Sequence, residues 1–276
     1  MMNSFVFFGT PSVASETLAA LLTAGFVPTL VVTSPDAPKG RGLVLTPSPT
    51  KVLAEERGIP VLTPEKLDAP AIDAIRAYGA DYALVVAYGK IFPEELINAF
   101  RKGVLNVHYS LLPKYRGATP LESALLAGEQ ETGVTVQKMV KEMDAGDVIA
   151  QEATLIEDAE TARELRPRLI SMGANLLIKT LPGYLAEEIT PTPQDAALAT
   201  RAYKLKKEDG LLDLSGDPKE NWHKYRAYAD TIGTYFFADG KRVKITDAEP
   251  AKDGFRVLSV IPEGKREMRF EDFLKH

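Results

Sequence analysis

The chain begins with short apolar runs that alternate with segments of helical periodicity. The runs Phe5–Phe8, Thr29–Val32 and Tyr82–Ala87 are too short for typical helices and read as buried strands. Between them, Val13–Ala24 and Thr50–Arg57 repeat apolar residues at the spacing of one helix face. Buried strands that alternate with helices are typical of a parallel sheet covered on both faces. The pattern therefore predicts an α/β fold with a doubly wound, mostly parallel, Rossmann-like sheet.

The same alternation continues to about residue 187. Further strands are expected at Val61-Leu62, Gly103–His108, Gly133–Met139 and Val148–Ala153. Further helices are expected at Ala71–Tyr78, Leu121–Ala127 and Thr161–Glu187. The polar stretch from Ser34 to about Pro47 predicts a loop.

Beyond residue 187 the pattern changes. Glu188–Leu198 is rich in Thr and Pro, as linkers often are. After it come a short helical segment and three short strands separated by turns such as Asp239-Gly240, namely Lys219–Ala229, Gly233–Ala238, Arg242–Ala248 and Phe255–Ile261. We expect a catalytic domain over residues 1–187, a linker over 188–206 and a small β-rich domain over 207–276.

Composition narrows the function classes. The chain has 276 residues, of which 45% are apolar, and it has no cysteine. Disulfides, thiolate metal sites and thiol nucleophiles are therefore excluded. No apolar run reaches the roughly 20 residues that span a bilayer, and the first residues lack the basic segment of a signal peptide. A cytoplasmic protein is expected.

Charge is unevenly distributed along the chain. The net charge is −5, yet residues 201–276 carry 16 Lys and Arg against 14 Asp and Glu. This asymmetry is either accidental or indicates that the tail faces a polyanion, because Lys and Arg make most phosphate contacts.

Ligands of open parallel sheets bind outside the carboxyl ends of the strands. The segments Gly9–Ser12, Ala87–Gly89 and Asn106–Gly117 fall there. None carries a GxGxxG fingerprint, and the chain has no P-loop. A dinucleotide or nucleoside triphosphate cofactor is therefore disfavoured.

Asn106 and His108 end one of the predicted strands. Strand alternation places them on the same side, roughly 7 Å apart. An amide donor beside a proton carrier suits acyl transfer, in which an oxyanion and a proton need separate partners. The alternative is that the pair only ties down a loop. The chain has three histidines, and no spacing typical of a metal site is apparent.

Asp144 and Asp147 flank the glycine of Asp144-Ala145-Gly146-Asp147. Either aspartate suits an Asx-type turn. Either could instead be the carboxylate that orients His108. Sequence spacing alone does not choose between these readings.

Two longer segments carry a family resemblance. Asn106–Gly117 reads NVHYSLLPKYRG and Gly133–Val148 reads GVTVQKMVKEMDAGDV. Together they resemble the signature of the folate-dependent formyltransferases, and within that family most closely the members that act on methionyl-tRNA. Supporting segments along the chain are Phe8–Pro11, Pro35–Val52, Val85–Gly89, Tyr203–Gly210 and Pro262–Met268.

The resemblance implies 10-formyltetrahydrofolate as donor and initiator methionyl-tRNA as acceptor. No metal is expected, and we expect a monomeric protein. It implies that Asn106 and His108 stabilise the oxyanion and that Asp144, rather than Asp147, positions His108. The implied folate-binding residues are Val86, Ala87, Tyr88, Gly89, Ser110, Leu111, Leu112 and Pro113. The implied tRNA-binding residues are Lys39, Arg41, Lys204 and Lys207. For two neighbouring residues a purely structural role is an alternative: Tyr115 could only pack, and Arg116 could be a solvated loop charge.

The C-terminal part departs from the family pattern. Only six residues separate Ala248 from Phe255, where the family has a longer segment with additional strands. The second domain therefore resembles a reduced, OB-like version of the family's barrel. The alternative function that follows is a sugar or small-molecule N-formyltransferase that uses the same donor.

Overall fold

The computed structural model describes residues 4–40, 42–252 and 254–275. The chain divides into two compact units. The first comprises the chain up to Lys114 together with Gly133–Glu152 and Leu169–Ala199. The second comprises Tyr115–Thr132, Ala153–Arg168 and the chain from Thr200 onward. Each unit is therefore assembled from three separate stretches of sequence. The domain boundaries at residues 187 and 207 stay a prediction.

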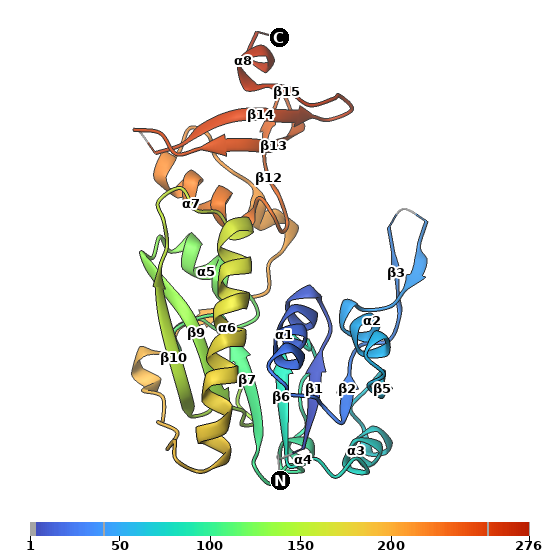
Figure 1. Cartoon of the computed structure of the whole chain (residues 1–276). Helices are drawn as coiled ribbons and strands as arrows, with labels where there is room; N and C mark the ends of the chain where they lie inside the picture. Colours follow the sequence, from blue (N-terminus) through green and yellow to red (C-terminus); the bar gives the residue numbers. More distant parts are fainter. Residues whose placement is uncertain (1–3, 41, 253, 276) are drawn as a thin grey trace. The chain divides into compact units, whose positions relative to one another are not determined.

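A seven-stranded sheet forms the centre of the first unit (Figure 1). Its order is β10-β9-β7-β6-β1-β2-β5. The bounds are β1 Phe5–Gly9, β2 Leu30–Val32, β5 Val61–Leu62, β6 Tyr82–Val86, β7 Val104–His108, β9 Glu131–Lys138 and β10 Val148–Leu155. Neighbouring strands from β5 to β7 pair in parallel, and β9 pairs antiparallel to β7. The predicted α/β class with a mostly parallel sheet is confirmed.

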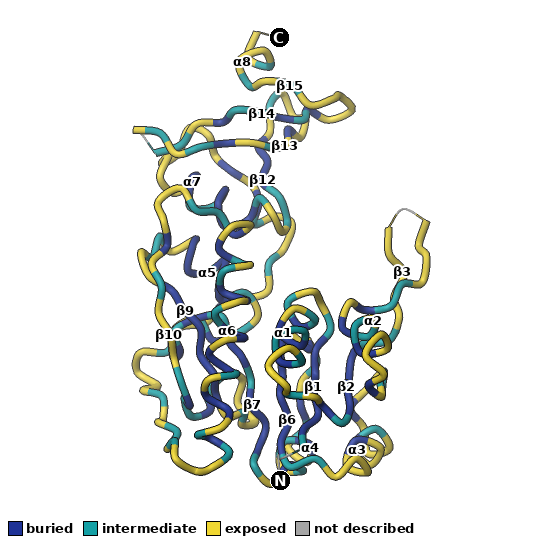
Figure 2. The backbone as a smooth tube through the Cα atoms, in the orientation of Figure 1, coloured by how far each residue is buried: buried dark blue, intermediate teal, exposed yellow. Residues whose placement is uncertain are grey.

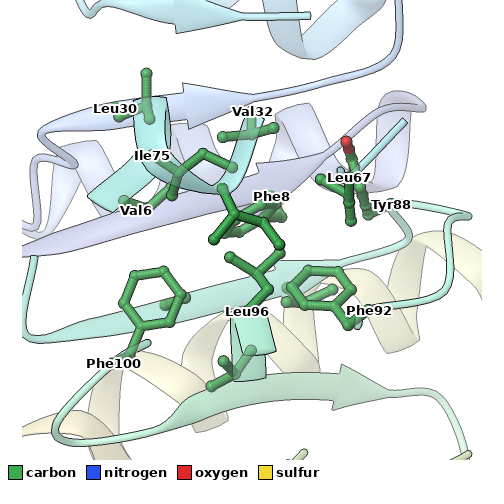
Figure 3. Close-up of a cluster of buried hydrophobic side chains, with 14 residues drawn as sticks. Val6, Phe8, Leu30, Val32, Leu67, Ile75, Tyr88, Phe92, Leu96 and Phe100 are labelled. Carbon is green, nitrogen blue, oxygen red and sulfur yellow. The ribbon is translucent and has the colours of Figure 1, made fainter. Parts of the chain in front are cut away.

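Strands β1 and β6 lie in the middle of this sheet and are buried along their whole length (Figure 2). Burial on both faces explains why their sequences, FVFFG and YALVV, are continuous apolar runs. One core cluster packs Phe8 against Phe92, Phe100 and Tyr88 (Figure 3). Tyr88 and Phe92 belong to the loop that follows β6, so this cluster anchors that loop.

Several helices begin at side-chain caps followed by proline. Ser48 accepts a hydrogen bond from the Lys51 backbone at the start of α2, and Asp68 accepts one from Ala71 at the start of α3. The bounds of the helices are α1 Ser12–Thr23, α2 Pro49–Glu56, α3 Ala69–Arg76, α4 Glu94–Ile97, α5 Pro120–Leu126, α6 Ala162–Leu185, α7 Pro218–Tyr228 and α8 Phe270–Phe273. No helix among the described residues is both long and apolar enough to cross a membrane.

The prediction of a loop from Ser34 to about Pro47 is wrong in part. It contains a hairpin of β3 (Ala37–Lys39) and β4 (Val44–Thr46). Both strands are largely exposed, with Leu43, Val44 and Leu45 each more than 60% accessible to solvent. An exposed hairpin needs no alternation of apolar and polar residues, so no periodic pattern marks these strands in the sequence.

The second unit contains a four-stranded antiparallel sheet in the order β12-β13-β14-β15. Its bounds are β12 Thr234–Ala238, β13 Lys241–Glu249, β14 Arg256–Pro262 and β15 Met268–Arg269. Trp222 and Tyr225 of α7 pack with Phe236, Val243 and Val260 of the sheet. This arrangement confirms the predicted small β domain.

Part of the predicted linker is paired rather than free. Within the second unit, β11 (Arg201–Ala202) lies parallel to β8 (Arg116–Gly117). A Cβ atom on Gly117 would lie 2.2 Å from the Ala202 carbonyl oxygen, so this close approach requires glycine.

Candidate functional site

Asn106 and His108 lie on β7, where the sheet changes from parallel to antiparallel pairing. Across the antiparallel partner β9, Asn106 is opposite Gln137 and His108 is opposite Thr135. Residues directly opposite one another share a sheet face, and alternate residues of a strand share it too. These four polar side chains therefore line one face. His108 is buried and Asn106 is half-buried.

Asp144 comes from the loop after β9 and lies beside His108. Its Oδ2 atom is 3.7 Å from His108 Nδ1, and the two side chains are 14% and 6% exposed. Asp147 contributes to this loop through its backbone, because its carbonyl accepts a hydrogen bond from the Lys138 amide at 2.9 Å. The structure therefore brings Asp144, rather than Asp147, to the histidine.

The backbone of the Asp144 loop is tightly constrained. Asp144 has a φ of 53°, in the left-handed region that aspartate tolerates better than most residues. A Cβ atom on Gly146 would lie 1.6 Å from the Lys138 carbonyl oxygen, so no other residue fits there. The Gln194 amide donates to the carbonyls of both Asp144 and Gly146, at 2.9 and 2.6 Å. The carboxylate is thus presented by a loop that is fixed from two sides.

The Asp144 side chain has a hydrogen-bond donor of its own. Gln137 Nε2 donates to Asp144 Oδ1 at 2.9 Å. The other carboxylate oxygen is the one that lies near His108. A carboxylate in this position can stabilise an imidazolium and orient the ring.

Thr135 organises the loop that follows β7. Its hydroxyl donates to the Ser110 carbonyl at 2.7 Å and accepts from the Leu112 amide at 3.2 Å. Gln151 donates to the Leu112 carbonyl and to the Thr135 hydroxyl. The predicted folate-binding residues Ser110, Leu111, Leu112 and Pro113 thus have much of their backbone hydrogen-bonding capacity satisfied by the protein. Ser110 and Leu112 are buried, whereas Leu111 and Pro113 are half-buried and present partly apolar surface.

The loop after β6 has different properties. Val86 is buried, whereas Ala87 and Gly89 are exposed and both have positive φ values, of 46° and 80°. The Tyr88 ring points into the core, as Figure 3 shows, and burial raises the pKa of its phenol to about 12. Tyr88 therefore presents a ligand with backbone only. Exposed backbone at the carboxyl end of a strand suits a flat heterocycle that is recognised by amide and carbonyl groups, as a pterin is.

The predicted tRNA-binding residues belong to different parts of the fold. Lys39 is exposed on the β3–β4 hairpin of the first unit, and Lys204 and Lys207 are exposed in the second unit. Arg41 lies outside the described residues. Exposed lysines of this kind suit phosphate contacts.

Tyr115 and Arg116 belong to the second unit. The Tyr115 hydroxyl donates to Glu129 at 2.7 Å, and its backbone amide donates to Thr200. Burial, followed by the contact with Glu129, raises the pKa of Tyr115. Arg116 is 9% exposed and pairs through its backbone with β11, so it is not a solvated loop charge.

Sequence reasoning missed Thr135, Gln137 and Gln194. A signal for the first two was present, because β9 alternates Val134 and Val136 with Thr135 and Gln137. Polar residues at alternate positions of a fully buried strand indicate a polar site on that face. No comparable signal marks Gln194, which lies in the Thr- and Pro-rich segment. Among the described residues, no group of three or more His, Asp or Glu side chains is arranged to hold a metal ion.

Comparison with known proteins gives consistent results. Residues 2–181 match the model of a family described as formyl transferase. A methionyl-tRNA formyltransferase from Geobacter metallireducens is 39% identical over 98% of this chain and 94% of its own length. One from Bdellovibrio bacteriovorus is 42% identical over 93% of this chain and 81% of its own length.

A solved structure has a similar fold. It is the N-formyltransferase from Helicobacter canadensis in complex with folinic acid and dTDP-3-aminofucose. The two chains superpose with a TM-score of 0.71 at 18% identity, covering 97% of this chain and 99% of that chain. At this identity the likeness concerns the fold alone.

Proposed function

The chain belongs to the formyl transferase family, and we propose that it transfers a formyl group from 10-formyltetrahydrofolate to the α-amine of initiator methionyl-tRNA. The proposal rests on one observation above the others, that Asp144 lies beside His108 on the sheet face that also carries Asn106. The relatives named methionyl-tRNA formyltransferase, which match nearly the full chain, support the choice of acceptor. The enzyme acts in the cytoplasm as a monomer and supports translation initiation.

Three side chains supply the chemistry. Asn106 donates its amide N–H to the oxygen of the formyl group as negative charge develops there. His108 stabilises the same oxyanion and exchanges a proton with the reacting nitrogens, since the attacking amine must lose a proton and the departing folate nitrogen must gain one. Asp144 orients the imidazole and stabilises its charged form.

Two loops hold the donor. The exposed backbone of Ala87 and Gly89 hydrogen-bonds the pterin, while Val86 and Tyr88 fix that loop to the core. Ser110, Leu111, Leu112 and Pro113 form the opposing wall, which Thr135 and Gln151 keep in place. A fixed donor and a fixed proton carrier reduce the entropy that must be lost in the transition state.

The proposal also assigns basic residues that bind the tRNA. Lys39 on the hairpin, Lys204 and Lys207 in the second unit, and Arg41 bind phosphates of the acceptor. These contacts position the tRNA without reading its sequence.

An acceptor competition tests the proposal. The purified protein is given the same formyl donor with methionyl-tRNA in one assay and a nucleotide-linked amino sugar in another. Formylation of methionyl-tRNA, slowed by roughly 10²-fold or more in the Asp144→Asn variant, is the expected result. Formylation of the amino sugar alone would replace the proposed acceptor with a small molecule, and release of formate without either acceptor would identify a hydrolase.

A further inference from the structure

Gln137 is a buried amide, and only one of its two polar side-chain atoms has a hydrogen-bond partner among the described residues. The residue is 1% exposed, on a strand that is buried from Thr132 to Gln137. Its Nε2 atom donates to Asp144, whereas its Oε1 atom is buried without a hydrogen-bond partner. The orientation of the amide is set by chemistry, because the opposite orientation would place Oε1 against a carboxylate oxygen.

The unpartnered oxygen argues against a packing role. A buried carbonyl without a partner is destabilising, and an apolar side chain of similar length would avoid that cost. Val134 and Val136, on the other face of the same strand, show that β9 does use apolar residues where it only packs. The one side-chain hydrogen bond that Gln137 makes with the described residues, to Asp144, is therefore what the position provides.

Different groups control the backbone and the side chain of Asp144. Gly146 and Gln194 fix the backbone of the loop. These contacts are made to the backbone, and the Cβ–Cγ torsion of a carboxylate has a broad energy minimum. The hydrogen bond from Gln137 to Oδ1 restricts that rotation and directs Oδ2 toward His108 Nδ1.

We propose that Gln137 is a positioning residue, which sets the orientation of the Asp144 carboxylate and through it the tautomer and ring orientation of His108. The inference rests on the proposed function, since it concerns the same site. Gln137 acts through Asp144 and contacts no substrate. Its partner across the strand pair is Asn106, so the two residues that direct charge in the site are held by one pair of strands.

The first experiment compares Gln137→Met with a matched control, Gln130→Met. Methionine keeps the length of the side chain and removes the N–H donor, and Gln130 is an exposed glutamine just before β9. Turnover is followed as tetrahydrofolate release, which does not depend on which acceptor is used. We expect kcat to fall about tenfold to a hundredfold in Gln137→Met, the scale of a lost hydrogen bond to a charged group. KM for the donor and the turnover of Gln130→Met stay unchanged.

A double-mutant cycle separates positioning from folding. If Gln137 acts through Asp144, adding Gln137→Met to Asp144→Asn lowers turnover little further. If the losses instead multiply, or if Gln137→Met turns over like the unaltered protein, the proposal is wrong. A second variant, Gln137→Glu, places two carboxylates together, and we expect it to lose more activity than Gln137→Met.

Nitrogen NMR of the histidine rings gives a readout that needs no acceptor. The chain has three histidines, so the His108 signals can be assigned from a His108→Gln sample. We expect Gln137→Met to shift the ring-nitrogen signals of His108 and to leave those of His223 in place. Unchanged His108 signals would overturn the proposal even in a protein that formylates methionyl-tRNA. Conversely, shifted signals in a protein that formylates only an amino sugar would retain Gln137 and reject the proposed acceptor.

Discussion

His108 Nδ1 lies 3.7 Å from Asp144 Oδ2, although one residue ends a parallel strand and the other belongs to the loop after an antiparallel one. The distance is longer than a hydrogen bond and short enough for a strong electrostatic contact. Pairs of this kind tighten when substrate binds, because the imidazole gains positive charge as the reaction proceeds.

Replacing His108 with alanine removes the proton carrier. We expect kcat to fall by at least roughly 10²-fold, the usual contribution of a positioned acid or base. Donor affinity, measured by fluorescence titration, should change little because the folate loops do not depend on this side chain. A variant that retained full turnover would show that the chemistry lies elsewhere, and His223→Ala on α7 serves as the comparison.

Replacing Asp144 with asparagine removes the charge but keeps the shape, and the Gln137 amide can still donate to the new side chain. We expect turnover to fall by roughly 10²-fold or more, since the imidazolium loses its counter-charge. Asp147→Asn is the matched control, because Asp147 contributes a backbone carbonyl to the loop and should tolerate the change. Equal losses in the two variants would contradict the assignment of Asp144.

Gly146→Ala tests the close approach between the Asp144 loop and β9. The new Cβ atom would meet the Lys138 carbonyl oxygen at 1.6 Å, so the loop must move. We expect a loss of about 1–3 kcal/mol in the free energy of unfolding, as for other overpacked sites, together with a loss of turnover. Urea denaturation measures the first. Gly42→Ala, whose Cβ would make only an ordinary contact with Val44, should leave stability unchanged.

His223 makes stability depend on pH. Burial lowers the pKa of His223, with further lowering by the charges of Arg226 and Lys219 and some opposition from Asp217 and Glu220. The unfolded chain therefore takes up this proton at a higher pH than the folded chain does. The free energy of unfolding should fall as the pH drops through the ordinary histidine value of 6.5.

The measurement is urea denaturation at about pH 7.5 and about pH 5.5, on either side of the ordinary value. Between these two pH values, we expect the free energy of unfolding to fall less in His223→Gln than in the unaltered protein. An identical loss in both proteins would mean that other groups account for the dependence.

Salt should weaken the binding of tRNA. Phosphate contacts release counterions, so the affinity falls linearly with salt on logarithmic axes. Exchanging Lys39, Lys204 or Lys207 for alanine should each reduce that slope by about one unit or less. Filter binding at several salt concentrations measures it. An affinity that is flat with salt would show that the excess of basic residues in the tail is accidental.

The sequence allowed some of these features to be predicted, and physical reasons explain the rest. Asn106 and His108 follow from strand alternation, a local property. Asp144 was predicted through the family resemblance, because no local sequence pattern indicates which distant loop lies beside a given strand. The direction of β9 was equally hidden, since a buried strand has the same apolar pattern in either direction. The β3–β4 hairpin is exposed, so its sequence lacks the apolar pattern of a buried strand.

Gln194 has a consequence for how the protein is made. The first unit draws on three stretches of the chain, and Gln194, close to the end of the last one, ties down the loop that presents Asp144. During synthesis on the ribosome, the parallel strands from β1 to β7 emerge first and can begin to pair. The Asp144 loop receives the hydrogen bonds of Gln194 only after that residue has left the exit tunnel. The nascent chain can therefore form its scaffold before the loop that carries Asp144 is held in place.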